Sequence, residues 1–347
     1  MKEHAAITPD GVPRTGSMKL SIIILCWNDL KVITNCLRSI YASTHSSEFE
    51  VIVSDNGSSD GSIEFIRKTF PQVRLIENGV NLRFAKGNNV GIRASRGEYV
   101  LILNPDTIIH HGTLDRWVEY ADRHPEAGAF GCRVLNPDGS YQESARPFPT
   151  IRGEWISALE LRALGRITDW LVADSYTGWK GDRERVIDWH SGCCTLVRGD
   201  LLRKIGGFDE QFFYYYEDTD LCRRIWNAGY KILFSPEMTI THLGGQSTKR
   251  APVAFQLDSQ ITRYRYYYKY FGERGASRAR HVAITSLFIR RFGYGLLQFF
   301  RPNESRQRRL EVLRLTYEWN LLVDPVRLVE KQEEPALSCE PARLAER

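Results

Sequence analysis

The sequence predicts an α/β protein built on a mostly parallel, Rossmann-like sheet with flanking helices and a helical extension at the C-terminal end. Short apolar runs rich in Ile and Val, such as KLSIIIL at residues 19–25, are typical of strands buried on both faces. These runs alternate with segments in which apolar residues recur every three or four positions, as they do on amphipathic helices. Such alternation indicates a parallel, doubly wound sheet, and only the helical spacing continues beyond residue 250.

The order of the elements follows from the same spacing. The first strands are expected at residues 19–25, 49–54, 73–77 and 99–103, and the helices between them at residues 30–41, 62–70 and 84–95. A loop-rich stretch with two helices should follow at residues 146–188, then a strand at 189–197, a helix at 218–227 and strands at 231–234 and 238–241. Two amphipathic helices complete the chain, one carrying Ile284, Phe288, Phe292, Leu296 and Phe299 and the other Leu310, Leu313, Tyr317 and Leu321.

Length and composition divide the 347 residues into four expected parts. A polar N-terminal arm (1–17) and a charged tail (330–347) should be disordered, while a main domain (18–250) and a helical region (251–329) should fold. The N-terminus lacks the apolar stretch of a signal peptide, and no run reaches the ~20 apolar residues of a membrane-spanning helix. Seven cysteines without a CxxC pair suggest reduced core thiols and hence a cytoplasmic protein.

The helical region is strongly basic. Between Arg263 and Lys331 the chain carries 15 Lys or Arg against 6 Asp or Glu. Such an excess predicts an anionic partner, but no recognised nucleic-acid module occurs there, so we expect no nucleic acid. Aromatic, amphipathic helices suit a membrane surface, which favours peripheral attachment to the inner face of the cytoplasmic membrane. A helical lid that packs on the main domain explains the same pattern and stays an alternative.

Polar segments follow three of the expected strands: CWND, DNGSSDG and NPDT. In doubly wound sheets, ligands bind beyond the carboxyl ends of the strands, so these segments should face one site. Asp55, which begins DNGSSDG, can read the edge of a base or a ribose diol through its carboxylate. Asp60, at the other end of the same segment, is explained by capping of the next helix.

Asp106 in NPDT is a candidate ligand for a divalent cation. Mg²⁺ and Mn²⁺ prefer oxygen ligands, and one or two carboxylates with substrate phosphates complete their shell. A turn in which Asp106 starts a following helix would account for the same residues. His242, in THLGG after a predicted strand, is a second candidate for a metal or diphosphate ligand, and a purely structural histidine is the alternative.

The run GGFDEQFFYYYEDTDLCRR carries a candidate general base. If a helix starts at Glu217, its buried stripe consists of Leu221, Cys222 and Ile225. Asp218 then points inward, whereas Asp220 and Arg224 should form an exposed i,i+4 pair. An inward carboxylate at a helix N-terminus stays ionised beside the free N–H groups and can take a proton from a hydroxyl. An N-terminal cap is the alternative role for Asp218.

Taken together and in this order, the segments resemble the inverting nucleotide-sugar glycosyltransferases of family 2, which have the GT-A fold. The resemblance covers roughly residues 18–245 and rests on SIIILCWND, VSDNGSSDGS, NLRFAKGNNVGIRASRGEYVLILNPDT, SGCCTLVR, GGFDEQFFYYYEDTDLCRR, GYKILFSP and THLGG. The NLRFAKGNN and FYYYEDTDLC blocks look closest to bacterial rhamnosyltransferases that build cell-wall or surface polysaccharide. The main domain is then expected to be a GT-A domain.

The resemblance also implies roles for individual residues. Asp218 would be the general base and Glu217 would shape the acceptor site, which Trp189, Ser191 and Gly192 would border. The donor pocket would consist of Asn28, Asp29, Asp55, Asn81, Phe84, Lys86, Gly87, Asn88 and Asn104. Asp106 and His242 would bind Mg²⁺ or Mn²⁺, although Asn104 stands where the family's Asp-x-Asp motif has its first acid.

The implied reaction is one in-line displacement in which Asp218 deprotonates an acceptor hydroxyl as it attacks the anomeric carbon, with inversion of configuration. By resemblance, we expect dTDP-rhamnose as the donor and a glycan or lipid-linked acceptor in cell-wall or surface polysaccharide biosynthesis. UDP-linked and GDP-linked sugars remain open as donors. The alternative function is a catalytically silent scaffold that binds nucleotide sugars, against which the presence of both Asp106 and Asp218 argues.

Overall fold

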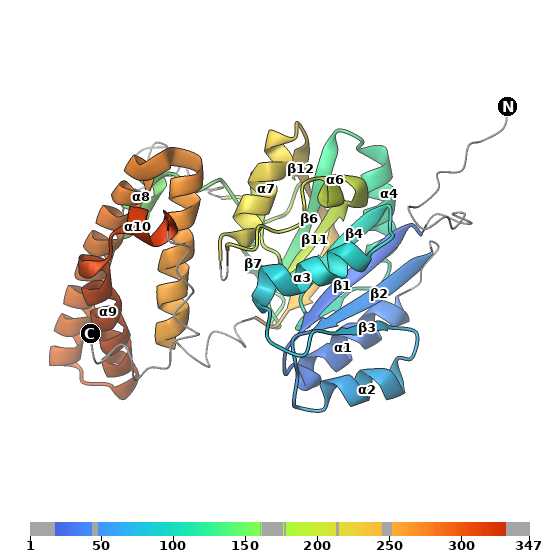
Figure 1. The fold of residues 1–347 in the computed structure, drawn as a ribbon, viewed down its shortest axis with the longest axis horizontal. Helices are drawn as coiled ribbons and strands as arrows, with labels where there is room; N and C mark the ends of the chain where they lie inside the picture. Colours follow the sequence, from blue (N-terminus) through green and yellow to red (C-terminus); the bar gives the residue numbers. More distant parts are fainter. Residues whose placement is uncertain are drawn as a thin grey trace. The chain divides into compact units, whose positions relative to one another are not determined.

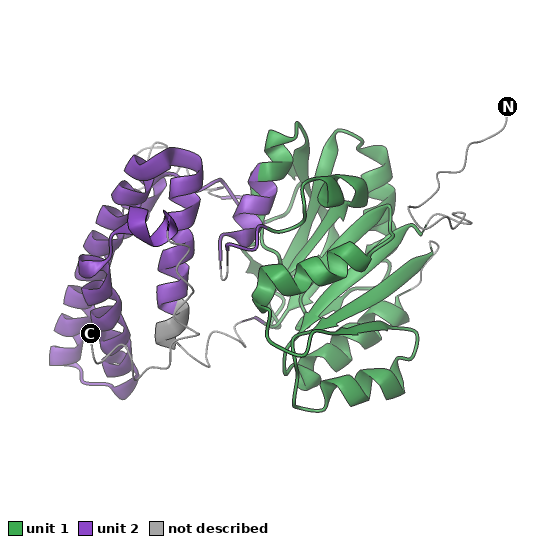
Figure 2. Ribbon diagram, viewed as in Figure 1, with its two compact units in different colours: residues 1–144, 181–208, 224–243 green, residues 145–180, 209–223, 244–347 purple. Residues whose placement is uncertain are grey.

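The computed structural model describes residues 18–43, 48–159, 161, 176, 178–212, 215–244 and 252–330. The chain forms two compact units that interleave along the sequence (Figure 2). The first unit comprises residues 1–144, 181–208 and 224–243, and the second comprises residues 145–180, 209–223 and 244–347. The expected N-terminal arm, the tail from residue 331 and the second helix expected within 146–188 lie outside the described residues. The predicted domain boundary at residue 250 stays a prediction.

A ten-stranded mixed sheet forms the centre of the first unit (Figure 1). Its main path runs β3-β2-β1-β4-β11-β6-β12-β5, with β7 beside β6 and β9 beside β12. The strands are β1 (Leu20–Cys26), β2 (Phe49–Asp55), β3 (Arg74–Glu77), β4 (Tyr99–Leu103), β5 (Thr107–Ile109), β6 (Ala127–Leu135), β7 (Tyr141–Gln142), β9 (Arg185–Val186), β11 (Cys194–Arg198) and β12 (Lys231–His242). Strands β1 to β4 pair in parallel, as predicted, whereas β11 runs antiparallel to both of its neighbours.

Helices cover both faces of this sheet because successive strand residues point to opposite sides. Ile22 and Ile24 of β1 belong to a core shared with α1, α2 and α4, whereas Ile23 and Leu25 meet α3. A Cβ on Gly91 of α3 would lie only 2.5 Å from Cγ2 of Ile23, so glycine is what allows this close approach. The helices of this unit are α1 (Leu30–Ala42), α2 (Ser62–Thr69), α3 (Arg83–Ala94), α4 (Thr113–Arg123) and α6 (Gly199–Lys204).

The prediction of a single strand at residues 189–197 is wrong, because these residues form two strands separated by a turn. The short β10 (Trp189–His190) is followed by a turn, and β11 starts only after it. The ring of His190 lies between two backbone carbonyls, with Nδ1 2.9 Å from that of Ser191 and Nε2 3.0 Å from that of Cys132. The Ser191 carbonyl is therefore engaged by a side chain and does not join a strand ladder.

The two strands predicted at residues 231–234 and 238–241 are one strand, β12. Its register against β6 shifts between Ser235 and Thr239, around Pro236. Proline has no backbone N–H to donate to a ladder, and an irregularity lets the strand continue past it. The predicted break is therefore a local irregularity in a strand that goes on to His242.

The second unit is mainly helical. Its elements are β8 (Ala145–Arg146), α5 (Ile151–Ala158), the start of α7 (Glu217–Asn227), α8 (Pro252–Phe300), α9 (Glu304–Leu322) and the unpredicted α10 (Pro325–Glu330). α8 is longer than the spacing predicts because two helices continue across Gly272, whose φ of 65° and ψ of −167° are non-helical. Tyr264, Tyr266 and Tyr267 of α8 form a buried aromatic core with Phe212. No helix in the described part of the chain has a stretch long and apolar enough to span a bilayer.

The cysteines of the described residues are buried free thiols: Cys26, Cys36, Cys132, Cys193, Cys194 and Cys222. Burial raises the pKa of the Cys26 and Cys36 thiols to about 12, so both stay protonated at neutral pH. They pack as small apolar side chains, which confirms the predicted core thiols for these six positions. Cys339 lies outside the described residues.

His190 is fully buried in the first unit. Burial lowers its pKa to about 4, even though the carbonyls of Cys132 and Ser191 favour the protonated form. The imidazole is therefore neutral at pH 7 and acts as a structural link between β6 and the turn before β11.

The buried, neutral His190 predicts a specific dependence of stability on pH. An unfolded histidine titrates near pH 6.5 and this folded one near 4, so the unfolded state binds more protons between these values. The contribution of neutral His190 to the free energy of unfolding is complete above pH 6.5 and is lost as the pH falls toward 4. The free energy of unfolding should fall by at most about 1.4 kcal/mol per pH unit in this range. The midpoint of urea unfolding should therefore fall more steeply between pH 7 and pH 5 in the wild type than in His190→Gln.

A His190→Gln protein with the wild-type slope would contradict the assignment, whatever its absolute stability.

Candidate functional site

The carboxyl ends of β1 and β2 lie level in the sheet. The register pairs Cys26 with Asp55, and Asp55 with Glu77 of β3, so the loops after these strands start side by side. Asn28, in the first loop, has a left-handed φ of 57°, which asparagine adopts more readily than most residues. Its Oδ1 accepts the backbone N–H of Ser59 at 2.7 Å, which ties the first loop to the second.

Two further carboxylates hold these loops. Oδ2 of Asp29 accepts the backbone N–H of Trp27 at 3.1 Å. The Asp60 carboxylate accepts the N–H of Leu30 at 2.9 Å and that of Ser62 at 3.1 Å, the first residues of α1 and α2. Partial burial opposes ionisation, but the bonds from Ser62 and Leu30 lower the pKa of Asp60 below its ordinary value. Asp60 therefore binds the first backbone N–H of both helices, although the N-cap residue of α2 is Gly61.

Asp55 is the fully buried last residue of β2. Its Oδ1 accepts the backbone N–H groups of Gly57 at 2.9 Å and Ser58 at 2.8 Å. Its Oδ2 is buried without a hydrogen-bond partner among the described residues. A buried acceptor without a donor is costly, so it points to a donor that arrives with a ligand. The N–H edge of a pyrimidine base has the required chemistry.

Asn56 connects this loop to the start of α3. Its Nδ2 donates to Oδ1 of Asn81 and to the carbonyl of Arg83, both at 3.2 Å. Asn81 Oδ1 also accepts the N–H of Arg83, whose φ of 67° is left-handed. A Cβ on Gly87 would lie 2.9 Å from Asn56 Oδ1, so a larger residue would push α3 away. The structure therefore places Asn81 and Gly87 beside the Asp55 loop.

The other donor candidates on α3 differ in their surroundings. Phe84 is half-buried with its ring 5.6 Å from that of Phe208, and Lys86 is exposed. Nδ2 of Asn88 donates to the Phe84 carbonyl at 3.0 Å, one turn back in its own helix. Asn89 is not among the predicted site residues, yet its amide exchanges two hydrogen bonds with the Phe208 backbone, at 2.9 and 2.8 Å. Asn89 thus fixes the GGF segment against α3.

Pairing of β5 with the end of β12 brings the two predicted metal ligands together. His242 is the register partner of Thr107, and the N–H of Leu243 donates to the Asp106 carbonyl at 2.9 Å. As a result, Nε2 of His242 lies 3.2 Å from Oδ1 of Asp106. Both side chains are largely buried, so little water shields them from each other.

Gln142 on β7 orients the His242 ring. Its Oε1 lies 2.8 Å from Nδ1 of His242, while its Nε2 donates to Oδ1 of Asn136 at 3.1 Å. Because the amide N–H is used by Asn136, the oxygen faces the ring and Nδ1 must carry the proton. Nε2 of a neutral imidazole then directs a lone pair toward the Asp106 carboxylate, and a proton or a metal ion is required between these two acceptors. No sequence motif marked Gln142 or Asn136.

Asp106 and His242 fit a divalent cation that takes its remaining ligands from a diphosphate or from water. Two ligands at ~2.1 Å and at right angles would be roughly 3.0 Å apart, close to the observed spacing. Within the described ranges, no group of three or more His, Cys, Asp or Glu is arranged to hold a metal. This agrees with Asn104 in place of an acid; its backbone N–H donates to Cys193 and its carbonyl accepts from Thr107.

The three predicted acceptor residues lie on β10 and the turn that follows it in the first unit. Trp189 and Ser191 are half-buried and Gly192 is buried. The N–H of Ser191 donates to the Ser144 carbonyl at 2.7 Å, and its carbonyl lies against the His190 ring. The turn is therefore held by a backbone hydrogen bond on one side and by the His190 side chain on the other.

Glu217 and Asp218 begin α7 in the second unit. Glu217 is buried, and burial followed by the charge of Asp218 raises its pKa well above the ordinary value. Burial and the neighbouring charge of Asp218 therefore both favour the protonated form of Glu217. Asp218 is half-buried. Tyr215 and Tyr216, immediately before the pair, have left-handed φ values of 65° and 64°, a strain that the surrounding contacts must maintain.

A polar cluster holds this strained segment inside the second unit. The hydroxyls of Tyr216 and Tyr267 each donate to Oε1 of Glu154 at 3.2 Å. Oε2 of Glu154 accepts from the Arg263 guanidinium at 2.8 Å. Glu154 of α5 and Arg263 of α8 thus anchor the residue that precedes the Glu217–Asp218 pair.

The predicted exposed pair of Asp220 and Arg224 is wrong. Asp220 is fully buried and accepts hydrogen bonds from Nζ of Lys269 at 2.6 Å and the hydroxyl of Tyr270 at 2.7 Å. Arg224 donates instead to two backbone carbonyls at 2.8 and 2.6 Å. The reason is a long-range contact with α8, which residue spacing within one helix cannot reveal. The predicted buried stripe is confirmed for Leu221, Cys222 and Ile225.

Comparison with known proteins identifies the family to which the chain is similar. The family model described as Glycosyl transferase family 2 matches residues 21–188. The chain is 34% identical over 220 residues, 59% of this chain and 69% of the relative, to the N-acetylglucosaminyl-diphospho-decaprenol L-rhamnosyltransferase of Mycobacterium tuberculosis. It is 27% identical over 229 residues, 64% of this chain and 82% of the relative, to rhamnosyltransferase WbbL of Escherichia coli.

Among solved structures, the mannosyltransferase PcManGT of Pyrobaculum calidifontis has a TM-score of 0.51 and 16% identity, with 92% of this chain and 91% of that chain covered. At this identity the likeness concerns the fold alone, and it confirms the predicted GT-A fold with its helical C-terminal region.

The buried Asp220 should be a main source of stability in the second unit. We expect Asp220→Ala to lower the free energy of unfolding by about 2–4 kcal/mol, because Tyr270 and Lys269 lose a buried acceptor. Asp209→Ala removes the other partner of Lys269, at 2.7 Å and partly exposed, and should cost about 1 kcal/mol or less. Urea unfolding followed by tryptophan fluorescence measures the free energy of unfolding of both variants. A similar loss of free energy in both would show that the burial of Asp220 does not determine its contribution to stability.

Proposed function

The chain belongs to glycosyl transferase family 2, and on that premise we propose that it transfers L-rhamnose from dTDP-rhamnose to a hydroxyl of a glycan or lipid-linked acceptor in cell-wall or surface polysaccharide biosynthesis. The 34% identity to a rhamnosyltransferase over 220 residues supports the sugar and the class of acceptor. The observation that carries the catalytic part of the proposal is the arrangement of Asp106, His242 and Gln142 at the end of β12.

On the donor side, the chain's own residues would bind and orient the nucleotide. The unpaired Oδ2 of Asp55 would accept the N3–H of thymine, and the loops held by Asn28 and Asp60 would enclose the base and ribose. Asn81 and Gly87 at the start of α3 would border the same site. A thymine and a uracil offer the same N–H to Asp55, so this contact requires a base with a ring N–H donor and leaves the sugar to other residues.

Asp106 and Nε2 of His242 would hold Mg²⁺ or Mn²⁺, and the bound cation would stabilise the negative charge on the departing diphosphate. Gln142 keeps the His242 ring in the tautomer that leaves Nε2 free to bind.

On the acceptor side, Asp218 would take the proton of the acceptor hydroxyl as its oxygen attacks the anomeric carbon, and configuration would invert. Glu217 would stay protonated, because a second negative charge is disfavoured at its buried position. The pair would thus hold one charge, and Asp218 would be the member able to accept a proton. Trp189, Ser191 and Gly192 remain our candidates for the border of the acceptor site.

The choice of donor is tested by thermal shift of the full chain against dTDP-, UDP- and GDP-linked sugars, with and without Mn²⁺. We expect dTDP-rhamnose with Mn²⁺ to raise the melting temperature most. A larger shift with a GDP-linked sugar would overturn the pyrimidine assignment, and transfer assays then separate an enzyme from a silent scaffold.

Replacing the base should abolish transfer without abolishing donor binding. Asp218→Asn is expected to reduce kcat by roughly 10²–10⁴-fold, the usual contribution of a general base. Binding of dTDP-rhamnose, followed by calorimetry, should change little. Glu217→Gln is the matched control: the amide mimics a protonated carboxyl, so its loss in kcat should be much smaller. Near-normal turnover of Asp218→Asn, or an equal loss in Glu217→Gln, would contradict these roles.

Removing the residue that orients His242 should weaken metal binding. Gln142→Leu deletes the acceptor for Nδ1–H and is expected to reduce Mn²⁺ affinity about 10–100-fold, as loss of such outer partners commonly does. Electron paramagnetic resonance of free Mn²⁺ in the presence of dTDP measures this without any assay of transfer. Gln142→Glu keeps an acceptor oxygen and should bind Mn²⁺ more tightly than the Leu variant. The same affinity in wild type and Gln142→Leu would refute the proposed role of Gln142.

A further inference from the structure

The end of α8 exposes a patch of large apolar side chains in the second unit, which we call the aromatic patch. Its members are Phe288, Phe292, Leu296, Leu297, Phe299 and Phe300. Each exposes between 50% and 80% of its surface, which is unusual for six large apolar residues within 13 positions. Leaving such a patch in water is unfavourable, so a covering partner is expected.

The patch occupies one side of its helix. At 100° per residue, Phe288, Phe292, Leu296 and Phe299 fall within an arc of about 80°. Phe300 and Leu297 extend the patch beyond one end of this arc, and arginines border the patch on both sides. Arg291 lies on one flank, and Arg290 and Arg301 lie beyond Leu297 on the other. An apolar strip bordered by cations is typical of a helix that lies in a membrane interface.

The next helix adds positive charge at the same end of the unit. Between Arg290 and Arg309 there are six arginines and one acid, Glu304. The acid is 92% exposed at 3.9 Å from Arg308, so it neutralises little of this charge in water. The cluster is therefore positive over a short length of chain, directly after the aromatic patch.

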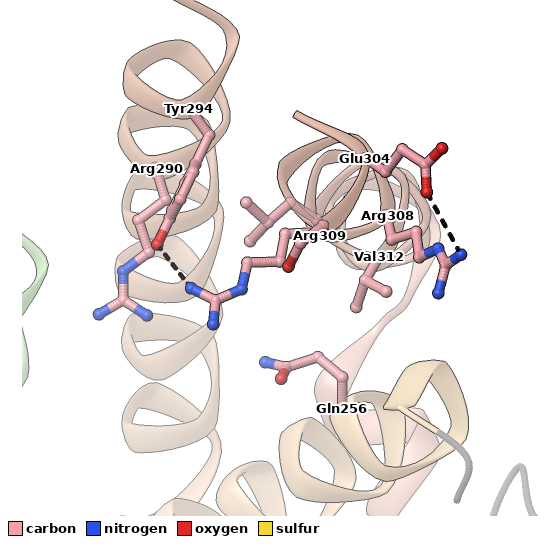
Figure 3. Close-up of a pocket in the computed structure, with 9 residues that line it drawn as sticks. Gln256, Arg290, Tyr294, Glu304, Arg308, Arg309 and Val312 are labelled. Atoms are coloured by element: carbon pink, nitrogen blue, oxygen red, sulfur yellow. Dashed lines mark hydrogen bonds and ion pairs between the residues drawn. The ribbon is translucent and has the colours of Figure 1, made fainter. Parts of the chain in front are cut away.

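A cavity of about 780 Å³ lies among these arginines, between α8 and α9. Figure 3 shows Arg309 of α9 reaching across to Tyr294 of α8, whose hydroxyl it contacts at 3.2 Å. Arg290 and Arg308 line the same cavity, and Gln256 from the start of α8 closes one side. Three arginines line this cavity, and a guanidinium group there, such as that of Arg309, suits the oxygens of a phosphate group.

We propose that this surface docks the protein on an anionic phospholipid bilayer, an interaction beyond the proposed transfer of a sugar. The aromatic patch inserts into the boundary between headgroups and acyl chains, and the flanking arginines bind headgroup phosphates. The cavity at Arg309 and Tyr294 receives one such phosphate. The charge selects this partner over a second copy of the chain, since six arginines on each copy would repel. Apolar insertion and basic charge together give the two contributions that stable interfacial binding requires.

Co-sedimentation of the full chain with vesicles tests this proposal, without donor or acceptor, so that its outcome is independent of sugar transfer. Vesicles of phosphatidylglycerol with phosphatidylcholine should bind the protein, and pure phosphatidylcholine should bind it much more weakly. Binding should also weaken as salt rises, because the arginine contribution is screened. Equal binding to both vesicle types, or no binding to either, would overturn the proposal.

Variants locate the surface. Arg308→Gln with Arg309→Gln should reduce partitioning roughly 25-fold, at about fivefold for each arginine near an anionic surface. Phe299→Ser with Phe300→Ser should reduce it by at least about tenfold. The matched controls are Arg314→Gln, whose charge is already paired with Glu311 and Glu318, and Leu322→Ala, at the far end of α9. Both controls should partition like the wild type.

The same variants exclude the other occupant. If the patch joined two copies of this chain, analytical ultracentrifugation would show a dimer that the Phe299→Ser and Phe300→Ser double variant converts to a monomer. A monomer for both proteins, with vesicle binding lost only in the variants, is the expected result. A dimer that depends on the patch would overturn the membrane assignment.

Discussion

The ligand-facing edge of the first unit depends on the register in which β1 pairs with β2. Because Cys26 stands opposite Asp55, the loops that follow leave the sheet at the same level and can bond to each other. Asn28 and Asp60 make these bonds, each from its own loop to the other. A slip of one residue would turn Asp55 to the other face of the sheet and separate the partners of both loops. The orphaned oxygen of Asp55 is buried at this edge only because the register is fixed there.

A second strand pairing, between β5 and β12, brings the candidate metal ligands together. β5 has only three residues, yet its antiparallel pairing with β12 sets His242 beside Asp106. The ring is then held by Gln142, which itself is held by Asn136. Such a chain of hydrogen bonds fixes a tautomer, and so a protonation state of one nitrogen, through groups that never touch a substrate. The arrangement is preorganised in the protein alone.

The second unit must hold two strained tyrosines and a carboxylate pair of which Glu217 is buried and Asp218 half-buried. Its core contains many hydroxyl and charged groups, and each must find a partner when buried. Glu154 accepts from two tyrosines and an arginine, and Asp220 accepts from a lysine and a tyrosine. These bonds make α8 the support of the α7 N-terminus. The same helix ends in the aromatic patch, so its two halves differ. Side chains of the first half are buried and hydrogen-bonded, whereas those of the second half are exposed and apolar.

The sequence by itself determined the elements whose signal is local. The period of apolar residues located β1 to β4 and α1 to α3 within a residue or two. The continuous apolar runs of β1 and β4 indicated burial on both faces, and both strands are buried almost throughout. It also identified Asp55, Asp106 and His242, since polar residues after buried strands must lie at the sheet edge. Only the tertiary structure decided which of these side chains meet and which groups orient them. Gln142, Asn89 and the burial of Asp220 left no local pattern, because each depends on a partner far along the chain. Such contacts are set by strand pairing and helix packing, which residue spacing within one element does not encode.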